Sequence, residues 1–166
     1  QNLIIIGATG NAGIFINNSN NNTIFQNNLT SNLNGVYVDN SSGNEVSGNT
    51  ISCNINNGIF IDTSSDTTLA YNTVKNNSNH GIKVNSSLNN TIYSNSISNN
   101  SLDGICLYNS SAGIYLNRIA GNGRYGLYNE GSGTVNATNN WWGSNNQTEV
   151  LASVQGTMDI TQWIVL

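Results

Sequence analysis

The acidic pair Asp39 and Asp62 is the best candidate for chemistry in this sequence. Each lies four residues after a glycine that recurs along the chain, so a repeating fold brings the two carboxylates into neighbouring repeats. Carboxylates about 5 Å apart can share a cation or couple their protonation, as lyases and hydrolases of polysaccharides require. Lys83, one repeat further on, can then meet a sugar carboxylate. The alternative is that aspartate only fills a turn position that Asn17 and Asn85 occupy in other repeats.

The single histidine and the two cysteines form no metal-binding or catalytic motif in the sequence. His80 precedes a recurring glycine at a position of variable residue type, which predicts a solvated turn residue. Cys53 and Cys106 lie about two repeats apart, or about 10 Å in stacked strands, which is too far for a disulfide. We therefore expect no disulfide and an outward-facing thiol at Cys106. Because there is no second histidine and the one methionine is Met158, near the C-terminus, we expect no metal site, copper included, and no cofactor.

A repeat of 22 or 23 residues must position these side chains. A glycine followed by alternating apolar residues recurs at Gly13, Gly35, Gly58, Gly81, Gly104 and Gly126. Two further apolar columns follow each glycine, separated by asparagine, serine and glycine. Segments that are short, rich in Ile and Val, and alternate with period two predict strands rather than helices. The sequence therefore predicts an all-β fold, a single-stranded right-handed parallel β-helix with three short strands per coil.

Two polar residue types recur in register with the glycines. The asparagines are Asn27, Asn49, Asn72, Asn95 and Asn117, and the serines are Ser19, Ser41, Ser64, Ser87, Ser110 and Ser132. Equivalent side chains of successive coils stack, so each asparagine amide can donate to one neighbour and accept from the other. We therefore predict a structural asparagine ladder, with a similar role for the serines. The alternative is that these are ordinary turn residues.

Composition and charge limit the classes of function. The 166 residues include 36 asparagines, only 7% are charged, and the formal net charge is −4. So few cations exclude a nucleic-acid partner. The lack of an apolar run of about 18 residues excludes insertion of this segment into a membrane. The length fits one domain, in which we expect β-helix coils over residues 1–135 and a C-terminal cap of the same domain over 136–166.

Two groups of aromatic residues have alternative explanations. Trp141, Trp142 and Trp163 follow the last repeat, and we expect them to cap the open end of the core; the alternative is an exposed platform for a sugar ring. The second group lies at equivalent outward positions of the first strand of each coil: Phe15, Tyr37, Phe60 and Tyr128. This aromatic ridge predicts either a binding surface for a glycan or protein, or aromatic pairs that only stabilise the sheet.

The repeat resembles that of short right-handed β-helices in secreted proteins, through the pattern Gly-Ile-x-[Ile/Val]-x-x-Ser followed by Asn-x-[Ile/Val]-x-x-Asn-x-[Ile/Val]. Such proteins include the periplasmic copper-maturation proteins of nitrous-oxide reductase and many archaeal surface proteins. The C-terminal stretch, with Asn140-Trp141-Trp142-Gly143 and Trp163-Ile164-Val165-Leu166, is similar to the end of β-helix domains in adhesin-like cell-surface proteins of methanogenic archaea. The resemblance implies export and attachment at the cell surface. From the aromatic ridge and the stackable ends of a solenoid, we expect surface glycans, other copies of the chain or other surface proteins as partners.

These observations lead to the hypothesis of a non-catalytic extracellular module, a rigid structural or adhesive spacer with a surface for contact or assembly. The alternatives are a carbohydrate-active enzyme that uses Asp39, Asp62 and Lys83, and a glycan-binding module on the aromatic ridge. Export would also permit N-glycosylation, and Asn-x-Ser/Thr patterns begin at Asn17, Asn40, Asn85 and Asn109.

Overall fold

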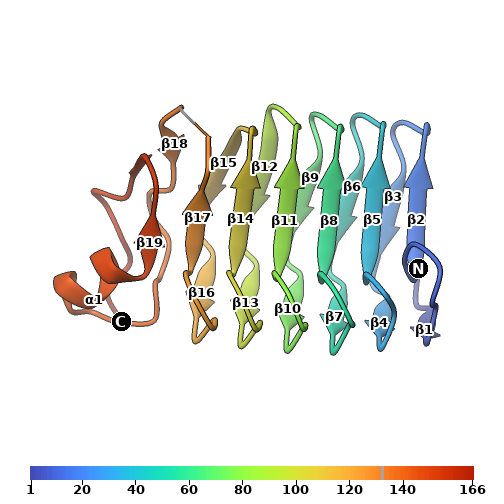
Figure 1. Ribbon diagram of the computed structural model, residues 1–166, viewed down its shortest axis with the longest axis horizontal. Coiled ribbons are helices and arrows are strands. Elements are labelled where there is room, and N and C mark those ends of the chain that lie inside the picture. Colours follow the sequence, from blue (N-terminus) through green and yellow to red (C-terminus); the bar gives the residue numbers. More distant parts are fainter. Residues whose placement is uncertain (132) are drawn as a thin grey trace.

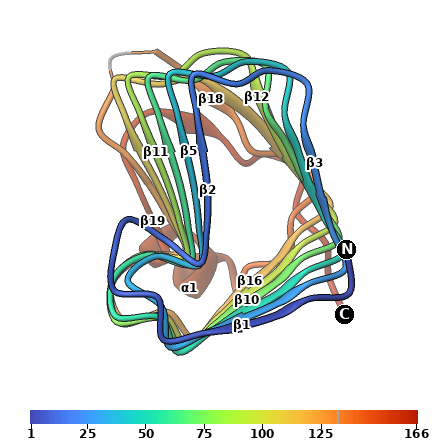
Figure 2. The same ribbon diagram turned by 90° about the vertical axis from the view of Figure 1, so that its right-hand side faces the viewer.

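The chain winds through three parallel sheets, with one strand of each sheet in every complete coil (Figure 1). The structure is a computed structural model that describes residues 1–131 and 133–166. Seen along the axis, the sheets enclose a three-sided core (Figure 2). The predicted right-handed parallel β-helix with three short strands per coil is confirmed.

The strands of each sheet follow one another along the axis. Sheet A holds β1 (Ile4–Ile6), β4 (Asn28–Thr30), β7 (Thr50–Ser52), β10 (Thr73–Lys75), β13 (Ser96–Ser98) and β16 (Arg118–Ala120). Sheet B holds β2 (Ile14–Asn17), β5 (Val36–Asp39), β8 (Ile59–Asp62), β11 (Ile82–Asn85), β14 (Ile105–Tyr108), β17 (Leu127–Asn129) and β19 (Val154–Gln155). Sheet C holds β3 (Thr23–Phe25), β6 (Glu45–Ser47), β9 (Thr68–Ala70), β12 (Asn90–Tyr93) and β15 (Ala112–Tyr115). A further pair joins β18 (Val135–Asn136) to β20 (Met158–Asp159).

Equivalent residues of successive coils pair with one another, as the repeat predicts. Ile59 in β8 pairs with Val36 on one side and with Ile82 on the other. Ile59 and Ile61 point inward and are fully buried, whereas Phe60 between them is half-buried on the outside. Alternate residues of the first strand of each coil therefore build the apolar core and the outer face of sheet B.

The predicted asparagine ladder is confirmed, and it continues to Asn140. Asn72 Nδ2 donates to Asn95 Oδ1 (3.0 Å) and to the carbonyl of Val46 (2.8 Å), and Asn72 Oδ1 accepts from Asn49 Nδ2 (3.0 Å). The backbone N–H of each serine donates to the next hydroxyl through Ser19, Ser41, Ser64, Ser87 and Ser110, and Ser132 lies outside the described residues. A second ladder, not predicted from the sequence, comprises Asn32, Asn54, Asn77, Asn100 and Asn122. These amides give the buried turns their hydrogen-bond partners.

The corners between strands explain why asparagine and glycine are so frequent. Many corner residues have positive φ, among them Asn40 (45°) and Asn76 (55°), and asparagine enters this region at a lower cost than most residues. Glycine recurs before the first strand of each coil for a different reason, which is the lack of space for a side chain. A Cβ on Gly58 would lie 2.5 Å from Val74 Cγ1 and 2.6 Å from the carbonyl oxygen of Gly81. The next coil therefore approaches too closely for any side chain at this position.

The C-terminal residues cover the last coil. Trp142 is buried in the core (4% exposed), and Trp141 and Trp163 are half-buried. Helix α1 (Gln147–Ala152) begins after Asn146, whose side chain caps it, and β19 adds a strand to the end of sheet B. The three tryptophans thus lie at the closed end of the solenoid. Among the described residues, no helix has the length and apolar character needed to cross a membrane.

Candidate functional site

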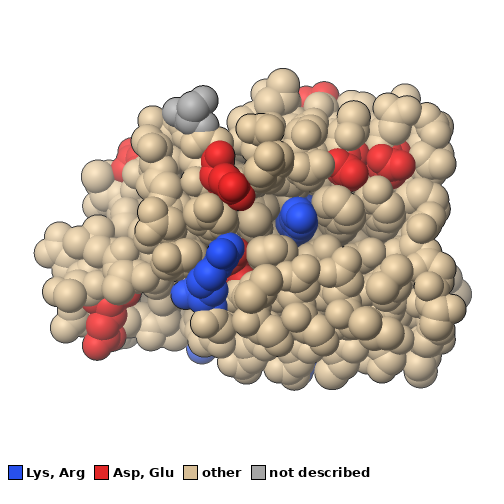
Figure 3. Space-filling view, in the orientation of Figure 1, with Lys and Arg blue, Asp and Glu red and all other residues tan. Residues whose placement is uncertain are grey.

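The outer face of sheet B gathers most of the residues that the sequence singles out. Of the chain's four basic and eight acidic residues, five lie on its strands or in the turns that lead into them: Asp39, Asp62, Lys83, Asp103 and Arg124. Figure 3 shows acidic and basic groups gathered on this face, over a surface that is otherwise largely uncharged. Because each coil contributes an equivalent residue, the outer side chains form rows along the solenoid axis.

Asp39 and Asp62 pair in register between β5 and β8. Asp62 Oδ1 accepts from Asn85 Nδ2 (2.6 Å), and Asp62 Oδ2 accepts from the hydroxyl of Tyr37 (3.4 Å). Burial and then the two nearby carboxylates raise the pKa of Tyr37 to about 12, so this hydroxyl remains a donor at neutral pH. The pair presents acceptors to a ligand, with Lys83 one coil away from Asp62 on the same face.

Phe15, Tyr37 and Phe60 form a continuous stack along the axis. The ring centroids are 4.9 Å apart between Phe15 and Tyr37 and 4.8 Å apart between Tyr37 and Phe60. Lys83 Nζ lies 5.6 Å from the centroid of Phe60 and extends the row. Since the rings cover one another's faces, mainly their edges and the Tyr37 hydroxyl are turned outward. Tyr128 lies two coils beyond Lys83 and is not part of this stack.

Asp103, fully buried just before β14, is the centre of the closest charged contacts on this face. Arg124 donates to it twice, from Nε to Oδ1 (2.8 Å) and from Nη2 to Oδ2 (2.5 Å), and the N–H of Tyr125 donates to Oδ1 (3.2 Å). Burial by itself would raise the pKa of Asp103, but the contacts with Arg124 and His80 outweigh burial and lower this pKa. The hydrogen bonds to Asp103 in turn raise the pKa of Arg124, so both groups are ionised at neutral pH.

His80 is not the solvated turn residue that the sequence predicts. It is only 7% exposed, and its Nδ1 lies 3.1 Å from Asp103 Oδ2. Nδ1 nevertheless has no aligned hydrogen-bond partner among the described residues. The prediction is wrong because the residue before each glycine is buried in four successive coils, at Asn34, Asn57, His80 and Asp103.

Cys106 is also buried, although its strand position between Lys83 and Tyr128 faces outward. The prediction is therefore right that Cys106 occupies an outward-facing strand position and wrong that its thiol is exposed. The longer side chains on both sides shield this small side chain from solvent. Cys53 and Cys106 are both free, as the repeat spacing predicts. Burial and then the charge of Asp103 raise the pKa of Cys106 to about 11, so its thiol is protonated at neutral pH.

His80, Asp103 and Cys106 bring a nitrogen, an oxygen and a sulfur within 4.8 Å of one another. The sequence analysis missed this cluster, yet a signal for it exists. His80 and Asp103 both directly precede a recurring glycine, one coil apart, and Cys106 follows the second of these glycines by two residues. The repeat therefore places all three close together, but it does not show that they are buried.

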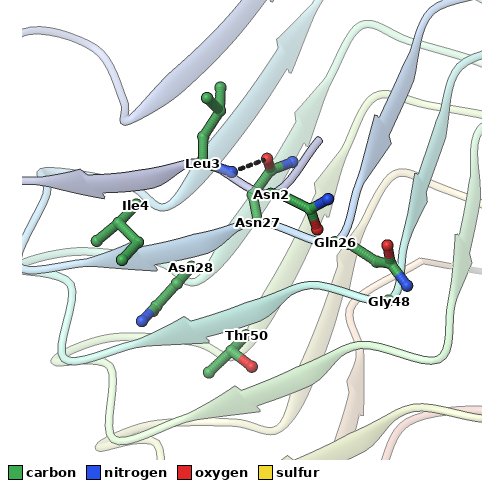
Figure 4. A pocket seen from close by; sticks show the side chains of 8 residues that line it. All are labelled: Asn2, Leu3, Ile4, Gln26, Asn27, Asn28, Gly48 and Thr50. Atoms are coloured by element: carbon green, nitrogen blue, oxygen red, sulfur yellow. Dashed lines mark hydrogen bonds between the residues drawn. The ribbon is translucent and has the colours of Figure 1, made fainter.

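Two hollows lie away from this cluster. The first is at the N-terminal edge, where the Leu3 N–H donates to Asn27 Oδ1 (3.0 Å) between the ends of β1 and β4 (Figure 4). The second lies near Leu88, Asn109 and Gly133. Neither hollow has a charged residue among those described in its lining. The charged residues of sheet B thus belong to an outer surface and not to either hollow.

Comparison with known proteins shows to which family the chain belongs and which solved structures it resembles. The family model described as periplasmic copper-binding protein (NosD) matches residues 4–163. The chain belongs to the NosD family. Solved structures similar to this NosD-family chain include a double mutant of the periplasmic alginate epimerase AlgG, at 23% identity and a TM-score of 0.77, and AlgG itself, at 24% and 0.74.

Each of these AlgG structures is covered over only 38% of its length, whereas the match covers 98% of the NosD-family chain. At this identity the likeness establishes the β-helix fold alone. A search of curated proteins finds no match. The narrower resemblance to archaeal adhesin-like proteins therefore stays a prediction.

Proposed function

We propose that this NosD-family chain is a non-catalytic module that binds extended glycan chains on the outer face of sheet B. The observation that carries the proposal is the repetition of this face, where aromatic, amide and charged side chains recur from coil to coil on an outer surface. A polymer that lies along the axis meets an equivalent side-chain position in each successive coil, about every 4.8 Å. Such a surface suits a chain-like ligand better than a small molecule, which needs a concave pocket.

The burial of the reactive groups supports binding rather than catalysis. Asp103, His80 and Cys106 are each less than 10% exposed. A general base or nucleophile must come within hydrogen-bonding distance of the reacting atom, and a polymer on the surface cannot approach these groups so closely. Asp39 and Asp62 are half-buried and can contact a ligand, where they serve as hydrogen-bond acceptors for sugar hydroxyls.

The proposal includes a location outside the cytoplasm, which the word periplasmic in the descriptions of the family and of AlgG supports. We extend it to a rigid, adhesin-like spacer at the cell surface of an archaeon, with glycans, further copies or other surface proteins as partners. N-glycans would lie at or just after the ends of sheet B strands, at Asn17, Asn40, Asn85 and Asn109. Mass spectrometry of the protein from its native host tests these four positions.

A glycan array tests the binding surface with two matched double variants. Tyr37→Ala/Phe60→Ala removes two stacked rings from sheet B, and Tyr93→Ala/Tyr115→Ala removes two stacked rings, 5.6 Å apart, from sheet C. We expect the sheet B variant to lose about tenfold or more in affinity and the sheet C variant to keep it. An unmodified protein that binds no glycan, or an equal loss in both variants, would refute the proposal.

A carbohydrate-active enzyme is the second candidate, favoured by the register pairing of Asp39 with Asp62 and by the fold shared with AlgG. We expect no cleavage or epimerisation when the protein is incubated with acidic and neutral polysaccharides, with and without calcium. Product that disappears in Asp62→Ala but persists in Asp159→Ala, which removes a carboxylate on β20, would replace the binding proposal with a catalytic one.

A further inference from the structure

The outer face of sheet B carries more negative than positive charge. The charged residues on its strands and in the turns beside them are the acidic Asp39, Asp62, Asp103 and Glu130 and the basic Lys83 and Arg124. With the histidine neutral, four carboxylates against two cations leave this face a net charge of −2, half of the formal net charge of −4 of the whole chain. A charged ligand on this face therefore meets a predominantly negative field.

The pairing of these groups concentrates the negative charge on β5 and β8. Arg124 donates twice to the buried carboxylate of Asp103, so these two charges largely cancel. Both ion pairs among the described residues involve Asp103, and Lys83 Nζ instead lies 5.6 Å from the centroid of an aromatic ring of the stack. Asp39 and Asp62 are therefore half-buried carboxylates that have no cationic partner in the described part of the chain.

The fold itself does not require carboxylates at these positions. In four successive coils the last residue of the sheet B strand is Asn17, Asp39, Asp62 and Asn85. Like charges directly opposite one another destabilise a sheet, and the flanking coils reach the same conformation with asparagine. Stability would therefore favour asparagine in all four coils, so the two aspartates beside the aromatic stack are better explained by their effect on a ligand.

Two carboxylates one coil apart act together on a ligand that lies along the axis. Adjacent coils are about 4.8 Å apart, whereas salt screens charges over about 8 Å at physiological ionic strength. An acidic group of a sugar on these coils is therefore repelled by both carboxylates. A sugar hydroxyl instead donates a hydrogen bond to either of them, because an ionised carboxylate only accepts.

We propose that the ligands of sheet B are glycans without acidic groups, and that Asp39 and Asp62 exclude glycans that carry carboxylate or sulfate. This inference rests on the proposed glycan-binding function and adds the class of glycan. The same two side chains contribute attraction for a neutral sugar and repulsion for an acidic one, and such a difference sets specificity.

The test is a glycan array that carries matched oligomers of a hexose and of the corresponding uronate, such as glucose with glucuronate and mannose with mannuronate. Chelator is present, because calcium would bridge two acidic groups. We expect the unmodified protein to bind the neutral oligomer of a pair at least about tenfold more tightly than the uronate. Sulfated glycans should bind as poorly as uronates.

Asp39→Asn/Asp62→Asn gives this column the residue that Asn17 and Asn85 already hold, so we expect the variant to fold, as circular dichroism shows. It should narrow the gap between neutral and uronate oligomers by about tenfold. Glu149→Gln/Asp159→Asn is the matched control, since it removes the same total charge from α1 and β20 and should leave the gap unchanged.

Salt gives a readout that needs no variant. At about 1 M salt the screening length falls to about 3 Å, so the unmodified protein should bind uronates more tightly than at physiological salt. Uronates that bind more tightly than their neutral partners, uronate binding that weakens with salt, or an unchanged gap in Asp39→Asn/Asp62→Asn would overturn the proposal. If no glycan binds at all, the proposed function itself fails, whereas a preference for acidic glycans refutes only this specificity.

Discussion

Removing one rung of the asparagine ladder should destabilise the whole solenoid. In Asn72→Ala, the carbonyl of Val46 loses the donor Asn72 Nδ2 (2.8 Å), and the backbone N–H of Asn49 loses the acceptor Asn72 Oδ1 (3.0 Å). Asn95 Oδ1 keeps its bond from the backbone N–H of residue 72 (2.9 Å), and Asn49 Nδ2 keeps its bonds to the carbonyls of Ile24 and Ser47. All four partners lose a contact, but Asn95 Oδ1 and Asn49 Nδ2 keep others, so the main loss falls on the Asn49 N–H and the Val46 carbonyl.

The expected loss follows from those two groups. A buried donor left without a partner, here the Asn49 N–H, costs about 1–3 kcal/mol, and the bond that the Val46 carbonyl loses while it stays in its sheet is worth about 0.5–1.5 kcal/mol, so Asn72→Ala should lower the free energy of unfolding by about 2–4 kcal/mol. This is a large part of the 5–15 kcal/mol that is typical of a whole domain. The effect should spread beyond one coil, because each rung is bonded to the coils on both sides.

Urea unfolding followed by circular dichroism measures this loss. Asn28→Ala is the matched control, since it removes the same amide from an exposed position on β4, next to the ladder residue Asn27. We expect the control to change stability by less than about 0.5 kcal/mol. If the loss in Asn72→Ala is no larger than in this control, the ladder does not hold the coils together and the reasoning fails.

Three further predictions concern other parts of the solenoid. Gly58→Ala should lower the melting temperature, because the new Cβ meets the backbone of the next coil, whereas Gly10→Ala has open space and should change little. Ile61→Ala should cost about 2–5 kcal/mol in urea unfolding, and Ile55→Ala, at a position that is 60% exposed, should cost far less. In an ultraviolet titration Tyr37 should ionise near pH 12, later than a tyrosine of ordinary pKa. Because the unfolded chain loses this proton near pH 10, the free energy of unfolding should fall as the pH rises from about 10 to about 12. A Tyr37 that ionises near pH 10 would contradict this.

The repeat made the fold predictable from the sequence. Strand signals of three or four residues are weak when they occur once, but six copies in register fix which residues share a column and which face each column takes. The pairing of Ile59 with Val36 and Ile82 follows directly from that register. The same reasoning could have found the second ladder through Asn54 and Asn77, whose spacing of 23 residues is equally regular.

The candidate site was less predictable because the turn position before the glycine is buried in four successive coils although its residue type does not repeat. The residue type before each glycine varies from coil to coil, so no pattern indicates that the backbone folds over it. The burial of Asp103 becomes understandable only with Arg124, which contributes its charge from the following coil. Nor does the sequence show that the neighbours of Cys106 in its row cover the thiol.

The column before the glycines also shows why a purely structural role is a poor explanation for this cluster. At Asn34 and Asn57 it is an amide pair, in which Asn57 Nδ2 donates to Asn34 Oδ1 (3.2 Å). In the next two coils the same buried position holds His80 and Asp103 instead. A buried carboxylate costs more to desolvate than an amide, even when an arginine pairs with it. A column that needed only stability would have continued with asparagine, so stability alone does not explain the change to ionisable side chains at His80 and Asp103.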